Sequence, residues 1–324
     1  MPTRFIQPVR ILVQFCFLGF MLWLGVRFYQ FVHFFSSGGL TSFVPRSDGI
    51  EGFLPISGLM GLSAWFRGLG INVIHPAALV LFVTILILSF LLRRSFCSWI
   101  CPVATISECA WKIGFKRFHR NPSLPQWFDK PLRGLKYLLL AFFTYSIVIV
   151  MPTEALRDFI ESDYHRVADV RLLDFFLHPS MIALGIILFL LAISVLLRNP
   201  FCRYFCPYGA LLGLAAVLSP ARVTRDKERC VSCGVCSQVC PTYIDVMHKQ
   251  SVASPECIGC WRCISHCRTQ GALSMRFAGK IRISGLVFSF LVVFFFWGGT
   301  AIGKWSDHWK TSLDKGEYAR LLGR

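Results

Sequence analysis

Long apolar stretches alternate with polar, charged loops along this chain. A helix of about 20 apolar residues can cross the hydrocarbon core of a bilayer. The pattern predicts an all-α polytopic membrane bundle of about five transmembrane helices. We expect these helices near residues 11–32, 75–92, 135–151, 180–197 and 281–302.

Composition narrows the class of protein. Hydrophobic residues make up 55% of the 324 residues, with 31 Phe, which favours a membrane protein over two soluble domains. The net charge of +17 is therefore interpreted by its position in the loops. No nucleic-acid-binding motif is recognisable, so the expected surroundings are membrane lipid and no nucleic acid.

Loop charges orient the predicted helices. Loop 93–136 is rich in Lys and Arg, whereas loop 152–179 is rich in Asp and Glu. Basic loops flanking membrane helices stay in the cytoplasm. The N-terminus, loop 93–136 and region 198–280 are therefore predicted inside the inner membrane of a bacterium. Loops 34–74 and 152–179 and the C-terminal tail are predicted outside.

The chain contains an internal repeat. LSFLLRRSFCSWICP at 88–102 aligns with ISVLLRNPFCRYFCP at 193–207, and a His-Pro pair precedes each copy at 75–76 and 178–179. Both copies run in the same direction across the membrane, so we expect two parallel two-helix repeats related by an axis along the membrane normal. The predicted repeats cover residues 10–118 and 133–219.

Each repeat ends in a Cys-x3-Cys-Pro motif, formed by Cys97 and Cys101 in one copy and by Cys202 and Cys206 in the other. Residues four apart share one face of a helix, so the two thiols of each pair lie side by side. Four such thiols near one symmetry axis can hold a further iron–sulfur cluster or a copper ion. Helix packing by small buried cysteines is the remaining alternative.

Eight more cysteines form two runs, CVSCGVCSQVCP at 230–241 and CIGCWRCISHC at 257–267. In the bacterial ferredoxin pattern, three cysteines of a run bind one cluster and the fourth binds the other cluster. Two structural zinc sites would instead use cysteine pairs with a longer spacer. We therefore predict an inserted α+β domain with two [4Fe–4S] clusters. The ligand sets are Cys230, Cys233, Cys236 and Cys267 for cluster 1, and Cys257, Cys260, Cys263 and Cys240 for cluster 2.

Histidines mark the predicted outer side. His75 and His178 begin the second and fourth helices, and His33 lies near the outer end of the first. A histidine at this depth can exchange protons with a quinol, ligate a metal, or bond to a loop carbonyl. With Asp174 nearby, these three histidines are the candidates for a quinone site.

The duplicated FCSWICP and FCRYFCP motifs, followed by a two-cluster ferredoxin segment, resemble the NapH-type membrane polyferredoxins. These are membrane subunits of quinol dehydrogenases and are related to NosR and to the CcoG-type proteins. The resemblance covers roughly residues 10 to 275 and implies an electron-transfer subunit that links quinone to a redox partner protein. The fifth predicted helix and the C-terminal tail depart from the four-span pattern of the NapH-type proteins.

Two functions remain open at this stage. One is electron transfer between the quinone pool and iron–sulfur clusters on the cytoplasmic side, in either direction. The alternative is copper handling or assembly, in which the Cys-x3-Cys-Pro thiols bind the metal and the clusters supply electrons. The predicted domains are a membrane domain at 1–220, a ferredoxin domain at 221–279, a fifth helix at 280–303 and an outer tail at 304–324.

Overall fold

The computed structural model describes residues 5–119, 121–122 and 124–322. The first residues of the predicted membrane domain and the last two of the predicted tail lie outside this range. The chain divides into two compact units. The first unit comprises residues 1–18, 85–140 and 187–296, and the second comprises 19–84, 141–186 and 297–324. All 14 cysteines belong to the first unit.

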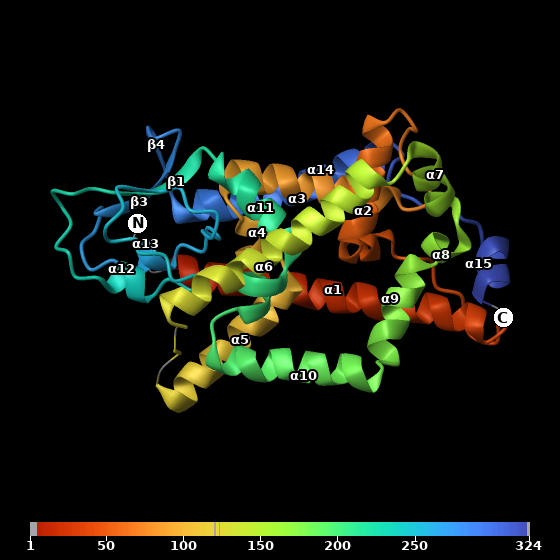
Figure 1. Cartoon of the computed structure of the whole chain (residues 1–324), viewed down its shortest axis with the longest axis horizontal. Coiled ribbons are helices and arrows are strands. Elements are labelled where there is room, and N and C mark those ends of the chain that lie inside the picture. The colour runs from red at the N-terminus through yellow and green to blue at the C-terminus, as the bar shows by residue number, and fades with distance from the viewer. Residues whose placement is uncertain (1–4, 120, 123, 323–324) are drawn as a thin grey trace. The chain divides into compact units, whose positions relative to one another are not determined.

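Long apolar helices dominate the fold (Figure 1). Three helices in the described part of the chain are long and apolar enough to cross a membrane, or four if a pair bent by 75° counts as one span. The helices at the predicted second and fourth spans have only 17 and 16 residues, so the five-span count stays a prediction. The long helices are α1 (Ile6–Ser36), α6 (Gln126–Thr144) with η3 (Tyr145–Val150), and α14 (Gly285–Trp305). The shorter helices are α3 (Pro76–Leu92), α10 (Met181–Leu196) and α9 (Ala168–Leu177), which forms the bent pair with α10.

Short helices in the first unit surround the paired cysteines. A proline begins the helix after each pair, where its missing N–H leaves no hydrogen bond unmade. Gly114 lies so close to α10 that a Cβ atom there would be 1.7 Å from the carbonyl oxygen of Val195. Only glycine therefore permits this approach of the two backbones. These helices are α4 (Ser95–Trp99), α5 (Pro102–Phe118), η4 (Phe201–Phe205) and α11 (Pro207–Val217).

A four-stranded antiparallel sheet completes the first unit. Its strand order is β2-β1-β3-β4, and Val223 of β1 pairs with both Val252 and Met275. With two short helices, it forms an α+β segment, as predicted. The elements are β1 (Ala221–Arg225), α12 (Val235–Gln238), β2 (Ser251–Val252), α13 (Arg262–Ser265), β3 (Leu273–Phe277) and β4 (Ile281–Ile283).

The structure corrects the predicted start of the fifth helix. The apolar pattern predicts that this helix begins at residue 281. In the structure residues 281–283 form β4, in which Ile283 pairs with Met275 of β3. The apolar side chains of Ile281 and Ile283 fit a strand as well as a helix, and pairing with β3 decides between them. Helix α14 begins at Gly285.

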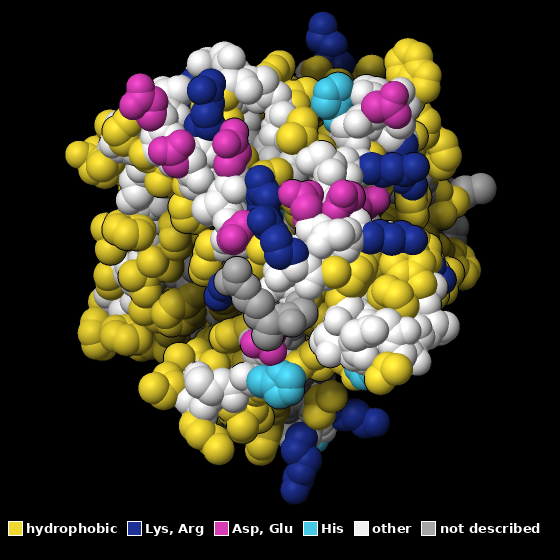
Figure 2. Space-filling view, turned by 90° about the vertical axis from the view of Figure 1, so that its right-hand side faces the viewer, with side chains coloured by type: hydrophobic (Ala, Val, Ile, Leu, Met, Phe, Trp, Pro, Cys, Tyr) yellow, Lys and Arg dark blue, Asp and Glu magenta, His cyan; other side chains and the backbone are white. Residues whose placement is uncertain are grey.

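The second unit contains small helices around two apolar clusters. One cluster is built on Phe28, Phe31 and Tyr318, and the other on Met60 and Leu156. Acidic and basic side chains lie close together on the face drawn in Figure 2.

Loop 152–179, which the sequence predicts as an outer loop, is largely helical in the structure. The small helices of the second unit include η2 (Asp48–Phe53), α2 (Pro55–Phe66), α7 (Thr153–Glu161), α8 (Asp163–Arg166) and α15 (Lys315–Leu322).

Candidate metal centres

Four cysteines of the ferredoxin segment line a first cavity. They are Cys230, Cys233, Cys236 and Cys267, which come from both ends of the segment. The backbone turns tightly here, with positive φ angles at Ser232 (52°) and Gly234 (73°). This turn brings three sulfurs of the first run to one wall, and folding of β3 against β1 places Cys267 at the same cavity.

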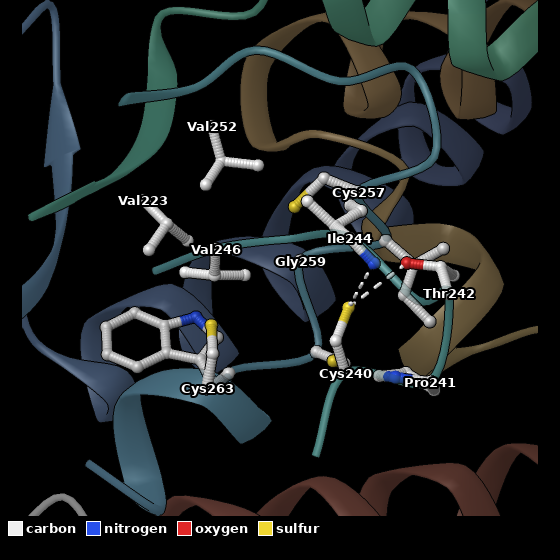
Figure 3. A pocket seen from close by; sticks show the side chains of 13 residues that line it. Val223, Cys240, Pro241, Thr242, Ile244, Val246, Val252, Cys257, Gly259 and Cys263 are labelled. Atoms are coloured by element: carbon white, nitrogen blue, oxygen red, sulfur yellow. Dashed lines mark hydrogen bonds between the residues drawn. The ribbon is translucent and has the colours of Figure 1, made fainter. Parts of the chain in front are cut away.

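The other four cysteines line a second cavity (Figure 3). Cys257, Cys260 and Cys263 come from the second run and Cys240 from the first. The remaining wall is apolar, with Val223, Val246, Val252, Ile244 and Trp261 among its residues. The Cys240 sulfur accepts a hydrogen bond from the backbone N–H of Ile244 at 3.4 Å. An N–H donor of this kind stabilises a thiolate.

Each set of four cysteines lines a cavity. Four thiolates around a single zinc ion, at a Zn–S distance of about 2.3 Å, would lie within about 4 Å of one another. Within the described residues, no three His, Cys, Asp or Glu side chains are grouped closely enough to hold a single metal ion. Four sulfur donors around a wider space fit an iron–sulfur cube.

A third cavity lies at the Cys-x3-Cys-Pro motifs. Cys97 from one repeat and Cys202 from the other line it. Cys101 and Cys206 lie nearby: burial, together with the neighbouring Cys97 and Cys206 thiols, raises the pKa of Cys101 to about 12. The backbone N–H of Gly209 donates to the Cys206 sulfur at 3.2 Å. The structure therefore brings the four motif cysteines together in one region.

Charged side chains surround the third cavity. Arg94, Arg198, Arg203 and Glu256 line it directly. Glu256 accepts from Lys136 Nζ at 2.6 Å and from Arg94 Nη1 at 3.5 Å. Burial opposes ionisation of Glu256, but the charges of Arg94 and Lys136 outweigh it and lower the pKa of this carboxyl group. The arginines next to the cysteine pairs are visible in the sequence, but only the structure places three of them at one wall.

Comparison with known proteins decides the family. A family model described as a 4Fe-4S binding domain matches residues 74–121 and again residues 177–225. A second model, described as a 4Fe-4S dicluster domain, matches residues 222–268. The putative electron transport protein YccM of Escherichia coli is 38% identical over 95% of this chain and 88% of its own length. The chain belongs to the iron–sulfur membrane polyferredoxins.

Other relatives of this polyferredoxin carry similar names. The ferredoxin-type protein NapH of Haemophilus influenzae is 27% identical over 72% of this chain and 76% of its own length. The methylamine utilization ferredoxin-type protein MauN of Methylorubrum extorquens is 28% identical over 64% of each chain. No solved structure matches. The resemblance stated from the motifs is confirmed.

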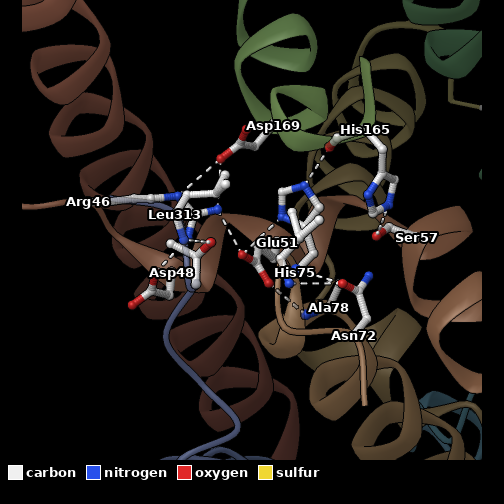
Figure 4. A network of polar contacts seen from close by, with 12 residues as sticks. Arg46, Asp48, Glu51, Ser57, Asn72, His75, Ala78, His165, Asp169 and Leu313 are labelled. Carbon is white, nitrogen blue, oxygen red and sulfur yellow. Dashed lines mark hydrogen bonds and ion pairs between the residues drawn. The ribbon is translucent and has the colours of Figure 1, made fainter. Parts of the chain in front are cut away.

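The histidines of this polyferredoxin occupy different surroundings in the second unit. His75 is fully buried, and its Nδ1 lies 3.2 Å from Glu51 Oε1 (Figure 4). His178 is exposed and lies 2.8 Å from a carboxylate oxygen of Asp174. His33 is also exposed, on α1. The histidines of the two His-Pro pairs therefore differ in surroundings, because His178 ends α9 at the bend before α10, whereas His75 is enclosed by η2 and α8.

Sequence reasoning missed most of the network around His75. Glu51 is fully buried, accepts from Arg46 Nη2 at 2.7 Å, and accepts from the backbone N–H of Ala78 at 3.0 Å. Arg46 also donates to Asp169 at 2.7 Å. The only signal for this network in the sequence is Glu51 itself, a single carboxylate in the apolar stretch GIEGFLP.

Proposed function

We propose that this polyferredoxin transfers electrons between the quinone pool and a redox partner protein through [4Fe–4S] clusters. One observation carries the proposal: the fourth cysteine of each run lies at the cavity of the other run. This exchange is the ligand pattern of a two-cluster ferredoxin. Cys230, Cys233, Cys236 and Cys267 would hold one cluster, and Cys257, Cys260, Cys263 and Cys240 the other, within a ferredoxin domain at 221–279.

The chain supplies thiolates, burial and hydrogen bonds to these centres. Bound clusters would carry single electrons, and the protein sets their potentials through its donors to sulfur and the charges around them. The apolar wall of the second cavity would give the sulfur atoms surroundings of low polarity. A partner protein would exchange electrons at the first cavity, where Cys230 is partly exposed.

The Cys-x3-Cys-Pro cysteines are proposed to hold a third iron–sulfur cluster. Cys97 and Cys202 line a cavity, and Cys101 and Cys206 lie beside it. The described side chains include no group of three that is compact enough for a single metal ion. A cube spans a larger separation between sulfurs than one copper ion does, so the geometry favours a cluster over the copper-handling alternative.

The quinone would bind in the second unit, at the predicted outer side of the membrane. The candidates are His75, His178, His33 and Asp174, and burial beside Glu51 favours His75 for exchanging a proton. The proposed orientation places the N-terminus and the ferredoxin domain in the cytoplasm and the tail 304–324 outside, in the inner membrane of a bacterium. The proposal rests on loop charge.

Anaerobic purification with iron and sulfide analysis tests this function. Two clusters correspond to about eight irons per chain, and three clusters to about twelve. Addition of a menaquinol analogue, or of a reductant followed by a menaquinone analogue, should change the EPR signals of the clusters. Iron well below eight per chain would contradict the cluster proposal, and unchanged signals with both quinone forms would contradict the quinone link.

Metal analysis also distinguishes a third iron–sulfur cluster from the copper-handling alternative. Cys97→Ser and Cys202→Ser variants should lose about four irons per chain and no copper if a third cluster is present. Loss of bound copper without loss of iron would instead support copper handling. A Cys109→Ser variant is the control, because Cys109 lies outside the Cys-x3-Cys-Pro motifs and outside both cysteine runs.

A further inference from the structure

The three cavities differ in the charges on their walls. Arg94, Arg198 and Arg203 line the third cavity. Arg225 is the charged side chain among the described residues that line the first cavity. The described wall of the second cavity contains no Lys, Arg, Asp or Glu. Positive charge is therefore concentrated at the Cys-x3-Cys-Pro motifs.

Ion pairs neutralise only part of this charge. Arg203 forms two hydrogen bonds with Asp129, at 2.9 and 2.7 Å, and Glu256 interacts with Arg94 and Lys136. Four cations thus face two carboxylates in this set: Arg94, Arg198, Arg203 and Lys136 against Asp129 and Glu256.

Arg198 has no carboxylate partner in this arrangement. Its Nη1 donates to the backbone carbonyls of Gln238 at 2.9 Å and Cys240 at 3.1 Å. The Nε groups of Arg94 and Arg198 are buried without a hydrogen-bond partner. Arg94 is itself only 2% exposed. Buried, unpaired guanidinium N–H groups at a cavity wall favour an occupant that carries negative charge.

The charges near the second cavity lie behind its wall, where Lys112 also pairs with Glu108, at 2.7 Å. Arg10 and Arg262 both lie near Cys260. Their shared partner is Glu108, at 2.6 Å from Arg10 and 3.6 Å from Arg262. Neither arginine belongs to the cavity lining, so their effect on a charge inside the cavity is weaker than that of a guanidinium group at the wall.

The second and third cavities are neighbours. Pro241, Thr242 and Ile258 line both of them. Glu256 lines the third cavity and directly precedes Cys257 of the second. An electron on a centre in one cavity therefore has a short path to a centre in the other.

We infer that the Cys-x3-Cys-Pro centre accepts electrons from the neighbouring centre in the second cavity. The inference rests on the proposed function, in which each cysteine group holds a cluster. A cluster with four thiolate ligands becomes more negative by one charge when it is reduced, and cations at a buried wall stabilise that form. The third centre thus has a higher potential than its neighbour in the uncharged cavity. With both clusters bound, an electron would leave the second-cavity centre, oxidising it, and would reduce the third.

An EPR-monitored redox titration of the purified full-length protein tests this order. The signal that disappears in Cys202→Ser identifies the third centre, and that signal should titrate at a higher potential than the one lost in Cys260→Ser. Arg198→Gln should shift the potential of the third centre downward, whereas Arg198→Lys, which keeps the charge, should leave it near the wild-type value. Arg225→Gln, at the first cavity, should not shift the third centre.

The outcomes separate this inference from the proposed function. The order of electron transfer would be wrong if the third centre titrated at a lower potential than the second. It would also be wrong if Arg198→Gln did not lower the potential of the third centre. Neither result would contradict the presence of the clusters. Equal iron content in wild type and Cys202→Ser would contradict the proposal of a third cluster, and the inference would then also fail.

Discussion

Nδ1 of His75 lies 3.2 Å from Oε1 of Glu51, and both side chains are fully buried. On the opposite side of the ring, Nε2 lies 2.8 Å from the backbone carbonyl oxygen of His165. Both ring nitrogens thus face acceptors, and an imidazole donates from both only when it carries two protons. His75 is therefore expected to be an imidazolium ion paired with the Glu51 carboxylate.

Removal of the Glu51 charge should destabilise the protein strongly. Glu51→Gln removes the carboxylate that pairs with Arg46 and with protonated His75. Breaking a buried ion pair in this way typically raises the free energy of the folded state by about 3–5 kcal/mol. Thermal unfolding in detergent measures the effect. Asp174→Asn is the matched control, because its carboxylate also pairs with a histidine but is exposed, and it should leave the midpoint unchanged. Equal midpoints for both variants would contradict a buried ion pair.

The neighbouring His165 should make stability depend on pH. Burial and the nearby His75 lower the pKa of His165 from 6.5 to about 4. The unfolded chain therefore binds a proton at this site before the folded chain does, and the free energy of unfolding falls as the pH falls from about 6.5 toward 4. Unfolding midpoints of wild type and His165→Asn over this range measure the contribution. The variant should show a weaker dependence, and parallel curves would contradict the assignment.

Gly114 should not tolerate a larger side chain. A Cβ atom there would lie 1.7 Å from the Val195 carbonyl oxygen, so α5 and α10 would have to separate. We expect Gly114→Ala to destabilise the protein by about 3 kcal/mol or more. Gly134→Ala serves as the control in helix α6, because nothing lies within 4 Å of its Cβ position. The yield and unfolding midpoint of the two variants should differ clearly, and similar values would mean that the helices are not packed this closely.

The Arg10–Glu108 pair should contribute to stability in a similar way. Arg10 is fully buried and donates to both carboxylate oxygens of Glu108, at 2.8 and 2.6 Å. Glu108→Gln removes one charge of this pair, and we expect a loss of about 3–5 kcal/mol in the free energy of unfolding. Asp245→Asn breaks an exposed pair with His248 and should have no measurable effect. Denaturant titration provides the comparison, and a small effect of Glu108→Gln would show that water reaches this pair.

Exchange of ligands between the two cysteine runs gives a spectroscopic prediction. Cys240→Ser and Cys260→Ser should abolish the same EPR signal, because both line the second cavity. Cys236→Ser should abolish a different one, although Cys236 and Cys240 are only four residues apart. Cys16→Ser, at an exposed position on α1, should change neither signal nor iron content. Loss of one signal in both Cys236→Ser and Cys240→Ser would contradict the exchange.

Sequence patterns predicted the parts of this protein that depend on local geometry. Three cysteines spaced by two residues can reach one side of a cube only through a tight loop, so the spacing alone indicates the chemistry. The apolar stretches likewise predicted helices at five places, because a continuous apolar face has to be buried in lipid or in a core. Residues 281–283 are the exception, since pairing with β3 overrides their place in an apolar run.

The sequence by itself determined the family, the iron–sulfur chemistry and the apolar helices, all of which follow from residue type and short spacing. Only the tertiary structure decided which distant groups meet: Glu51 with His75, three arginines with Cys97 and Cys202, and different surroundings for two histidines in matching motifs. The electrostatic potential at a site is the sum of the contributions of all charged groups that packing brings near it. Residues such as Arg94 and Arg203 are more than 100 positions apart in the chain, so sequence patterns do not show that they meet.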